Sequence, residues 1–409
     1  MKRTSKRFRL LLAVHKYLGL ATGIIVLLVS LTGAAWVFKE EIEPLYEPEF
    51  VFEPAAEAEL LSASRARELG QAVFPEHAIH GTLFEGTTAP VEVIFYQVEP
   101  RFYQSVFLHP TTGEILHTKD HLSGFFAWAL LGHMYLWLPM DVGSMIVKYG
   151  ILVFLFIIVS GLLIWLPGRV KRLRKNLSFR WKPTTGWRRK NFDLHSIVGV
   201  YIYVFAFLFA FTGSVIGLPW FYYATYKVLG GSGDPSFVIP ENVSAGRTAA
   251  ADDAAIPYDR LVPRLMREEP DARSFELHYP YSETSSVYVE IERGEGTFYR
   301  NDYRYFDQYT LEEIPSPGVY AKYADADFAK FVMRLNYDVH IGAIGGIPGK
   351  VIAFLASLVI ASLPVTGFVM WYGRRKKGKK RPPAAVRPTT YAEEEPIKRD
   401  KLAKEEYRV

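Results

Sequence analysis

The chain has 409 residues, of which 49% are hydrophobic and 15% aromatic, and its formal net charge is +5. It contains no cysteine, which excludes disulfides, haem attached through CxxCH, thiolate-ligated haem and cysteine-held iron–sulfur clusters in this chain. The average composition conceals four apolar runs separated by long polar stretches.

Each apolar run has roughly 20 residues, near the length that crosses about 30 Å of hydrocarbon at 1.5 Å per residue. The runs lie at 17–38, 149–166, 197–222 and 350–372. A basic start followed by an apolar run also begins a cleaved signal peptide, but the first run is longer than usual for one and closely matches the third. We therefore predict that it is retained as a membrane helix.

Charge predicts the orientation, because short cytoplasmic segments collect Lys and Arg. Basic clusters lie at the N-terminus, between the second and third runs, and after the fourth. They fall on one side if all four runs span, so we expect both termini in the cytoplasm and the acidic stretches 39–124 and 223–338 outside. The clusters then reflect topology, and no nucleic-acid partner is expected.

The first outer stretch has the pattern of a small α+β unit, with a short helix at 62–73 followed by strand-like pieces. The strands are predicted at 78–84, 91–96, 104–108 and 114–117. After them, LSGFFAWALLGHMYLWLP is apolar and aromatic but is separated from the second run by MDVG. We expect it to form a short helix on the outer membrane surface that carries His133.

The second outer stretch repeats this outline. A helix is predicted at 258–267, and the other predicted pieces are strands at 274–279, 286–292 and 296–299 and a hairpin arm at 306–314. FAKFVMRLNYDVH follows and places His340 before the fourth run, almost as His133 precedes the second.

An internal repeat relates the two halves. A shift of 180 residues superimposes four pairs without a gap: His15 on His195, Gly19 on Gly199, Thr32 on Thr212 and Gly33 on Gly213. The ends of the second and fourth runs also match, with Gly161 on Gly367. We therefore predict a membrane α-helical protein with four transmembrane helices in a two-fold tandem repeat of parallel topology and two α+β outer domains. The predicted segments are 1–38, 39–121, 122–143, 144–167, 168–191, 192–222, 223–325, 326–347, 348–373 and 374–409.

The four histidines at repeat-related positions predict two metal sites. A parallel repeat relates its halves by an axis along the membrane normal, so His15 should meet His195 near the inner surface, and His133 should meet His340 near the outer one. Two opposed imidazoles are the ligands of six-coordinate haem iron. A single histidine near a membrane interface is more often an ordinary polar residue, but four in this arrangement favour haem. Zinc or copper is less suited, because two imidazoles leave its coordination incomplete.

Glycines near the histidines fit this interpretation. Gly19 and Gly199 follow His15 and His195 by one helical turn, where a larger side chain would collide with a flat macrocycle. The Thr-Gly pairs at 32–33 and 212–213 lie about 25 Å further along, and we expect Gly33 and Gly213 to leave room near the outer pair. The six remaining histidines are expected to be ordinary surface or loop residues: His77, His80, His109, His117, His121 and His278.

The chain resembles the PepSY-associated transmembrane helix family of iron-regulated bacterial inner-membrane proteins. The resemblance covers nearly the whole chain and rests on HKYLGLATG with SLTG, LLGHMYLWLPMDVG leading to SGLLIWLPGR, DLHSIVGVY with AFTG, and DVHIGAIGGIPG leading to TGFVMWYGRR. The outer domains, with HPTTGEIL closing the first, resemble PepSY modules.

Members of that family include dihaem reductases that pass electrons to ferric siderophores in the periplasm. The resemblance implies two b-type haems, with His15 and His195 as axial ligands of the inner iron and His133 and His340 of the outer one. It also implies a ferric siderophore or other ferric chelate as substrate. The sequence has no nucleotide-binding motif, so electrons would come from quinol or a cytosolic reductase.

Two other functions remain open. The chain could be a non-enzymatic binding or sensing protein whose PepSY domains engage a periplasmic partner or peptidase, or, less readily, a transporter of the chelate. Several outer aromatic residues could floor a cleft for the chelate or anchor the chain in the membrane interface. They are Tyr135, Trp137, Trp220, Phe221, Tyr222 and Tyr223.

Overall fold

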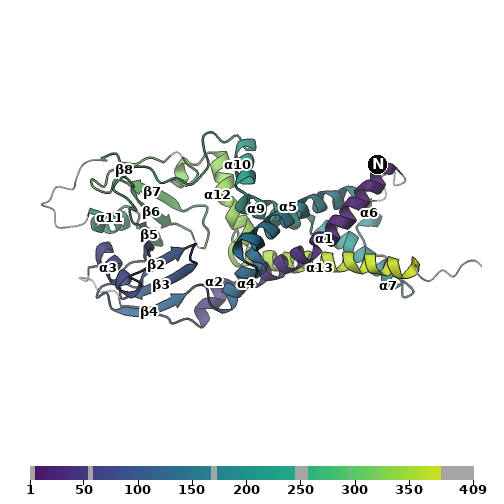
Figure 1. Ribbon diagram of the computed structural model, residues 1–409, viewed down its shortest axis with the longest axis horizontal. Coiled ribbons are helices and arrows are strands. Elements are labelled where there is room, and N and C mark those ends of the chain that lie inside the picture. The colour runs from purple at the N-terminus through teal and green to yellow at the C-terminus, as the bar shows by residue number, and fades with distance from the viewer. Residues whose placement is uncertain are drawn as a thin grey trace, which may run out of the picture.

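The computed structural model describes residues 5–53, 59–166, 173–244, 257–294, 296–316 and 318–378. Long helices form one end of the molecule, and a β-sheet with its covering helices forms the other (Figure 1). Most of the predicted cytoplasmic tail, from residue 379 on, and residues 167–172 of the predicted basic loop lie outside the described residues.

Three described helices are long and apolar enough to cross a membrane: α1 (Lys6–Trp36), α5 (Met140–Trp165) and α13 (Gly346–Gly378). The α1 helix packs against both α5 and α13. Their outward side chains are also apolar, since Ile24 and Phe156 are 60% and 67% exposed. A helix that is apolar on every side needs lipid around its outer face, so these helices identify a membrane protein.

The third run is bent rather than straight. It comprises α7 (Trp187–Asp193), a π-helical segment (Leu194–Val198), α8 (Gly199–Tyr201) and α9 (Tyr203–Gly217). The segment Trp187–Tyr201 meets the segment Tyr203–Gly217 at an angle of 64°. The two segments make a fourth membrane span only if they are counted as one. The predicted end at 222 is wrong, because Leu218 is extended and Pro219 starts a new helix, α10 (Pro219–Val228). Proline lacks the N–H that would continue the preceding helix.

The strands of the two predicted outer domains form one eight-stranded sheet in the order β4-β3-β2-β1-β5-β6-β7-β8. Antiparallel pairing of β1 with β5, with Thr82 opposite Leu277, joins the two halves. This pairing satisfies two strand edges that separate domains would leave open. The strands are β1 (Ile79–Phe84), β2 (Val91–Gln97), β3 (Phe102–Leu108), β4 (Ile115–Asp120), β5 (Ser274–His278), β6 (Val287–Glu292), β7 (Asp302–Phe306) and β8 (Glu313–Ile314).

Two helices cover one face of the sheet: α3 (Ala63–Val73) and α11 (Leu261–Glu268). Both were predicted, and the hydroxyl of Ser62 caps α3 by accepting from the N–H of Arg65. A single apolar core runs beneath them and includes Val93 of β2 and Leu277 of β5. The two halves of the sheet therefore share one hydrophobic core.

The strand predicted at 296–299 is absent from the described structure. The strand next to β6 is instead β7, which begins a few residues later, at Asp302. The backbone N–H groups of Phe298 and Tyr299 instead donate to the carboxylate of Asp338, each at 2.8 Å. Asp338 lies on α12 (Phe328–Ile341). This segment therefore attaches the sheet to a helix instead of extending it.

The predicted surface helices lie between the sheet and the long helices, as α4 (Gly124–Tyr135) and α12 (Figure 1). A tight turn follows α4, where Leu136 and Trp137 have positive φ, and α5 starts at Met140 instead of the predicted 144. The other described short helices are α2 (Lys39–Ile42) and α6 (Leu173–Asn176), with 3₁₀ turns at Glu43–Leu45, Pro257–Arg260 and Tyr323–Asp325.

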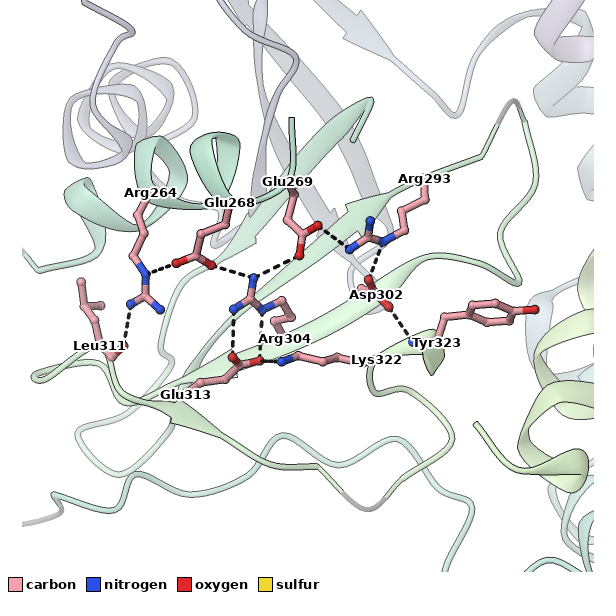
Figure 2. Close-up of polar contacts among 10 residues, drawn as sticks. All are labelled: Arg264, Glu268, Glu269, Arg293, Asp302, Arg304, Leu311, Glu313, Lys322 and Tyr323. Atoms are coloured by element: carbon pink, nitrogen blue, oxygen red, sulfur yellow. Dashed lines mark hydrogen bonds and ion pairs between the residues drawn. The ribbon is translucent and has the colours of Figure 1, made fainter. Parts of the chain in front are cut away.

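A charge cluster holds α11 against the last strands (Figure 2). Its centre is Arg304, whose side chain is only 7% exposed and forms ion pairs with Glu268 at 3.0 Å and Glu313 at 2.8 Å. Glu269 links Arg304 to Arg293, which also pairs with Asp302. A buried guanidinium needs such partners, because leaving its charge uncompensated costs several kcal/mol.

Candidate functional site

The first predicted histidine pair is brought together by two elements. His15 lies on α1, and His195 lies in the π-helical segment. Their ring centroids are 6.5 Å apart and the ring planes are inclined by 77°. The π-helical turn is an irregularity often found at functional sites.

The second predicted pair also meets. His133 of α4 and His340 of α12 have ring centroids 6.1 Å apart, with an interplanar angle of 60°. An imidazole nitrogen lies about 1.1 Å from its ring centre and about 2 Å from a bound metal, so two imidazoles on opposite sides of one ion have centroids about 6 Å apart. Both pairs have the separation that an intervening metal ion requires.

Each of the four rings is oriented through its Nδ1 atom. The acceptors are Ser160 Oγ at 2.9 Å for His15, Thr366 Oγ1 at 3.0 Å and the Leu363 carbonyl at 3.1 Å for His195, the Val29 carbonyl at 2.9 Å for His133, and Thr212 Oγ1 at 2.9 Å for His340. These contacts are typical of the groups that surround metal-binding histidines.

The hydroxyl contacts also determine which ring nitrogen carries the proton. Ser160 donates its own proton to the Ile157 carbonyl, and Thr212 donates to the Leu208 carbonyl at 2.7 Å. Each hydroxyl has only one proton, so it accepts from the histidine. A carbonyl can only accept. We therefore assign the proton to Nδ1 in all four rings, which leaves a lone pair on each Nε2. Within the described residues, we find no hydrogen bond to any of these Nε2 atoms.

Gly33 and Gly213 lie directly against the rings of the outer pair, near which they were expected to leave room. A Cβ at Gly33 would lie 2.9 Å from His133 Cε1, and one at Gly213 would lie 3.1 Å from His340 Cε1. The two glycines therefore make room for the imidazole rings themselves. Gly161 and Gly367 do the same for His15 and His195, at 3.1 and 3.4 Å.

Gly19 and Gly199 adjoin open space in the described structure. A Cβ at Gly19 would have no atom within 4 Å, and one at Gly199 would meet only Leu363 Cδ2 at 3.9 Å. The half-buried rings of His15 and His195 lie one turn away. The space beside the inner pair is thus compatible with a flat ligand, and the residues present fit a porphyrin iron.

A hydroxyl-glycine dipeptide, noted in the sequence only at 32–33 and 212–213, unites these contacts. Each long apolar run contains a Ser-Gly or Thr-Gly dipeptide: Thr32-Gly33, Ser160-Gly161, Thr212-Gly213 and Thr366-Gly367. In every case the glycine packs against the Cε1 edge of a histidine from another segment, and in three cases the hydroxyl accepts from the Nδ1 of that histidine. Thr32 is the exception, because it bonds to the carbonyls of Leu28 and Val29.

A cavity of about 800 Å³ lies beside the outer pair, where α9, α10 and α12 meet the sheet. Val215 follows Thr212 on α9, and Asn336 precedes His340 by one turn on α12; both line the cavity. The side chain of Asn336 also donates to the Thr212 carbonyl at 3.3 Å. The cavity and the outer pair therefore share two helices.

Two charged residues line the cavity, Arg334 and Asp234. Arg334 is the buried one of the two. Its guanidinium is 6% exposed and donates to the carbonyls of Tyr299, Val319, Ala321 and Asn301. Among the described residues, no carboxylate forms an ion pair with it. A buried cation held by carbonyls retains attraction for an anionic ligand.

Only two of the six aromatic residues that were considered for a chelate cleft line this cavity. Tyr222 and Tyr223 line the cavity, together with three tyrosines from other elements: Tyr303, Tyr320 and Tyr337. Tyr135, Trp137, Trp220 and Phe221 do not line it. Trp137 instead contacts the ring of Trp128, and Trp220 is 52% exposed.

The expectation for the six remaining histidines is wrong at His278, which is buried at the centre of the sheet and 6% exposed. It contacts His80 of the neighbouring strand, with ring centroids 4.9 Å apart. His117 and His121 lie on and just after β4, and their rings contact Phe107 and Tyr103.

Comparison with known proteins is consistent with these features. A family model described as a PepSY-associated TM region matches residues 12–374, a range that includes all four paired histidines. A comparison with curated proteins finds no match. Because the family model covers most of the chain, the chain belongs to the PepSY-associated TM region family.

Proposed function

We propose that the chain is a dihaem b-type electron-transfer protein of the bacterial inner membrane. In this proposal it reduces a ferric siderophore or other ferric chelate in the periplasm, its termini are cytoplasmic, and the sheet is periplasmic. The two halves form a tandem repeat, with the axial ligands His15 and His195 for the inner haem and His133 and His340 for the outer. The observation that carries the proposal is the pair of imidazoles at each site, whose ring centroids lie 6.5 and 6.1 Å apart and whose Nδ1 atoms are held by hydrogen bonds within the described structure.

When bound, haem would supply reversible one-electron chemistry at each site. The Nδ1 acceptors fix the orientation of the imidazole rings, so little reorganisation accompanies electron transfer. All of the acceptors are uncharged, so no carboxylate stabilises positive charge at the ligands. Each Fe³⁺ of the chelate substrate would take one electron to become Fe²⁺. A quinol donor would supply two electrons, enough for two such ions, and release two protons.

The cavity beside the outer pair supports the choice of substrate class. Binding sites for compact ligands occupy about 300–1,000 Å³, and this cavity measures about 800 Å³. Arg334 would attract an anionic chelate, against one opposing negative charge from Asp234, and the surrounding tyrosines would pack against its organic groups. In this proposal the electron donor is quinol or a cytosolic reductase. The basic segments on the cytoplasmic side could bind an acidic reductase.

Haem content in the purified protein tests the proposal. The wild-type chain should contain two b-type haems by pyridine haemochrome, His15→Ala and His133→Ala should each lose a different one, and His77→Ala should keep both as a control. Prereduced protein should be reoxidised by an anionic ferric chelate under anaerobic conditions. Colourless, folded protein from haem-replete cells would end the proposal.

The same variants address the alternative of a non-enzymatic binding or sensing protein. In that case the histidine variants would retain the cellular phenotype of the wild type, while removal of the strands between 79 and 120 would abolish it.

A further inference from the structure

A group of side chains of metal-binding type lies at the seam of the sheet, where β1 pairs with β5. His80 lies on β1, and Glu276 and His278 lie on β5. One ligand atom from each residue lies within 4.8 Å of the others. Side chains alternate along a strand, so Glu276 and His278 point to the face opposite the core that contains Leu277. Figure 1 shows α3 and α11 on one side of the sheet and the membrane helices on the other.

A β-bulge directs His80 toward this group. The pairing of β1 with β2 shifts between Ile79 and Gly81, which face Phe95 and Ile94, so His80 is the extra residue. A bulge changes the direction in which a side chain points and is common beside functional sites. The regular alternation of β1 is therefore interrupted at the residue that approaches β5.

Gly81 leaves space for the carboxylate. A Cβ at this position would lie 2.9 Å from Glu276 Oε1. Any other residue would displace Glu276 from its place beside His278, whose Nε2 is 3.3 Å from the same oxygen. The glycine therefore keeps the two ligand atoms together.

His278 presents a free ligand atom. Its Nδ1 donates to the carbonyl of His80 at 3.1 Å, and its ring stacks on Tyr288. The side chain is 6% exposed, yet Nε2 has no hydrogen-bond partner in the described structure. With its proton on Nδ1, the imidazole keeps a lone pair on this buried Nε2 that it can donate to a metal ion.

We propose that His80, Glu276 and His278 bind one divalent transition-metal ion, zinc or ferrous iron, with water completing its coordination. Two imidazoles and one carboxylate are a ligand set that suits these ions, whereas calcium and magnesium prefer oxygen ligands alone. Ligands of a tetrahedral ion are about 3–3.5 Å apart, so His80 must move slightly inward. It is exposed and able to do so. The site is remote in sequence from the four paired histidines and does not depend on the proposed function.

Zinc binding to the full chain tests this site without interference from haem iron. The protein is purified in detergent with a tag that contains no histidine, treated with a chelator and dialysed against Zn²⁺, and zinc is counted by elemental analysis. We expect one high-affinity zinc per chain. Glu276→Gln and His278→Ala should weaken binding by at least about 10–100-fold, and His117→Ala should leave it unchanged.

Separate measurements keep the result independent of folding. Metal-free Glu276→Gln is nearly isosteric and should retain the helical content and haem content of the wild type, while losing the upward shift in Tm that zinc gives the wild type. Competition with Fe²⁺ under anaerobic conditions, and with Mn²⁺ and Ca²⁺, identifies the preferred ion. Equal zinc uptake by wild type and Glu276→Gln, or the same loss in His117→Ala, would overturn the proposal.

Discussion

The hydroxyl of Thr212 provides a sharp test of how the outer histidine is held. Thr212 is 4% exposed, and its Oγ1 accepts from His340 Nδ1 at 2.9 Å while donating to the Leu208 carbonyl. In Thr212→Val the side chain keeps its shape but loses the acceptor. The Nδ1–H of His340 then loses its hydroxyl acceptor and keeps only a backbone contact with Phe209, and the loss of a partner by a buried polar group costs about 1–3 kcal/mol.

The ring can avoid this cost by moving its proton to Nε2, but that atom is the proposed iron ligand. In both cases the binding free energy of the outer haem becomes less favourable. We expect this haem to bind about 10–100-fold more weakly, which equals about 1.4–2.8 kcal/mol. The measurement is haem loss to excess apomyoglobin. It is made in a His15→Ala background, so that only the outer haem contributes.

Thr32→Val is the matched control. Thr32 is equivalent to Thr212 in the repeated sequence, but its hydroxyl bonds only to backbone carbonyls, and His133 uses the Val29 carbonyl instead. This variant should therefore keep the outer haem as tightly as its parent. Equal haem loss in both variants, or none in Thr212→Val, would refute the assigned hydrogen bonds.

Three further predictions concern the inner site and the sheet. Gly19→Leu should reduce inner haem content by pyridine haemochrome without changing the helical content of haem-free protein, because only a bound porphyrin would meet the new side chain. Arg304→Ala should lower the free energy of unfolding by about 1–2 kcal/mol, because it removes a side chain that is 7% exposed and its hydrogen bonds to Glu268 and Glu313, whereas the more exposed Arg264→Ala should cost less than about 1 kcal/mol. Burial opposes ionisation of Asp307, but hydrogen bonds from Ser244 and two backbone N–H groups outweigh it and lower its pKa from 3.8 to about 2. A lowered pKa stabilises the fold above about pH 4 and ceases to do so as pH falls toward 2, so this loss in Tm should be smaller in Asp307→Asn.

The sequence was sufficient to predict the elements that carry the site. Hydrophobic length indicated the long helices, and the repeat of 180 residues predicted which histidines meet. The pairing was expected because residues at matching positions of a parallel repeat should face each other across a common axis. The histidine helices α4 and α12 were also predictable, since a short apolar segment followed by a break cannot continue as a span.

The seam between β1 and β5 was not predictable in the same way. Thr82 and Leu277 pair across almost 200 residues, and strand register depends on such tertiary contacts more than on local pattern. The two halves therefore looked like separate domains, and His80 and His278 looked like unrelated surface residues. The bend in the third run was hidden for a related reason, because hydropathy registers an apolar helix whether or not a π-turn interrupts it.

The Ser-Gly and Thr-Gly dipeptides show why repeated sequence does not guarantee repeated contacts. All four place a glycine against a histidine ring, so the steric requirement is conserved between the halves of the molecule. The polar requirement is not, since His340 uses the hydroxyl of Thr212 whereas His133 uses a backbone carbonyl. α1 runs continuously past this point, whereas the third run bends by 64° before reaching it. The same dipeptide thus approaches its histidine along a differently shaped segment in each half, and the two histidines of the outer pair are held by different groups although the dipeptides beside them match.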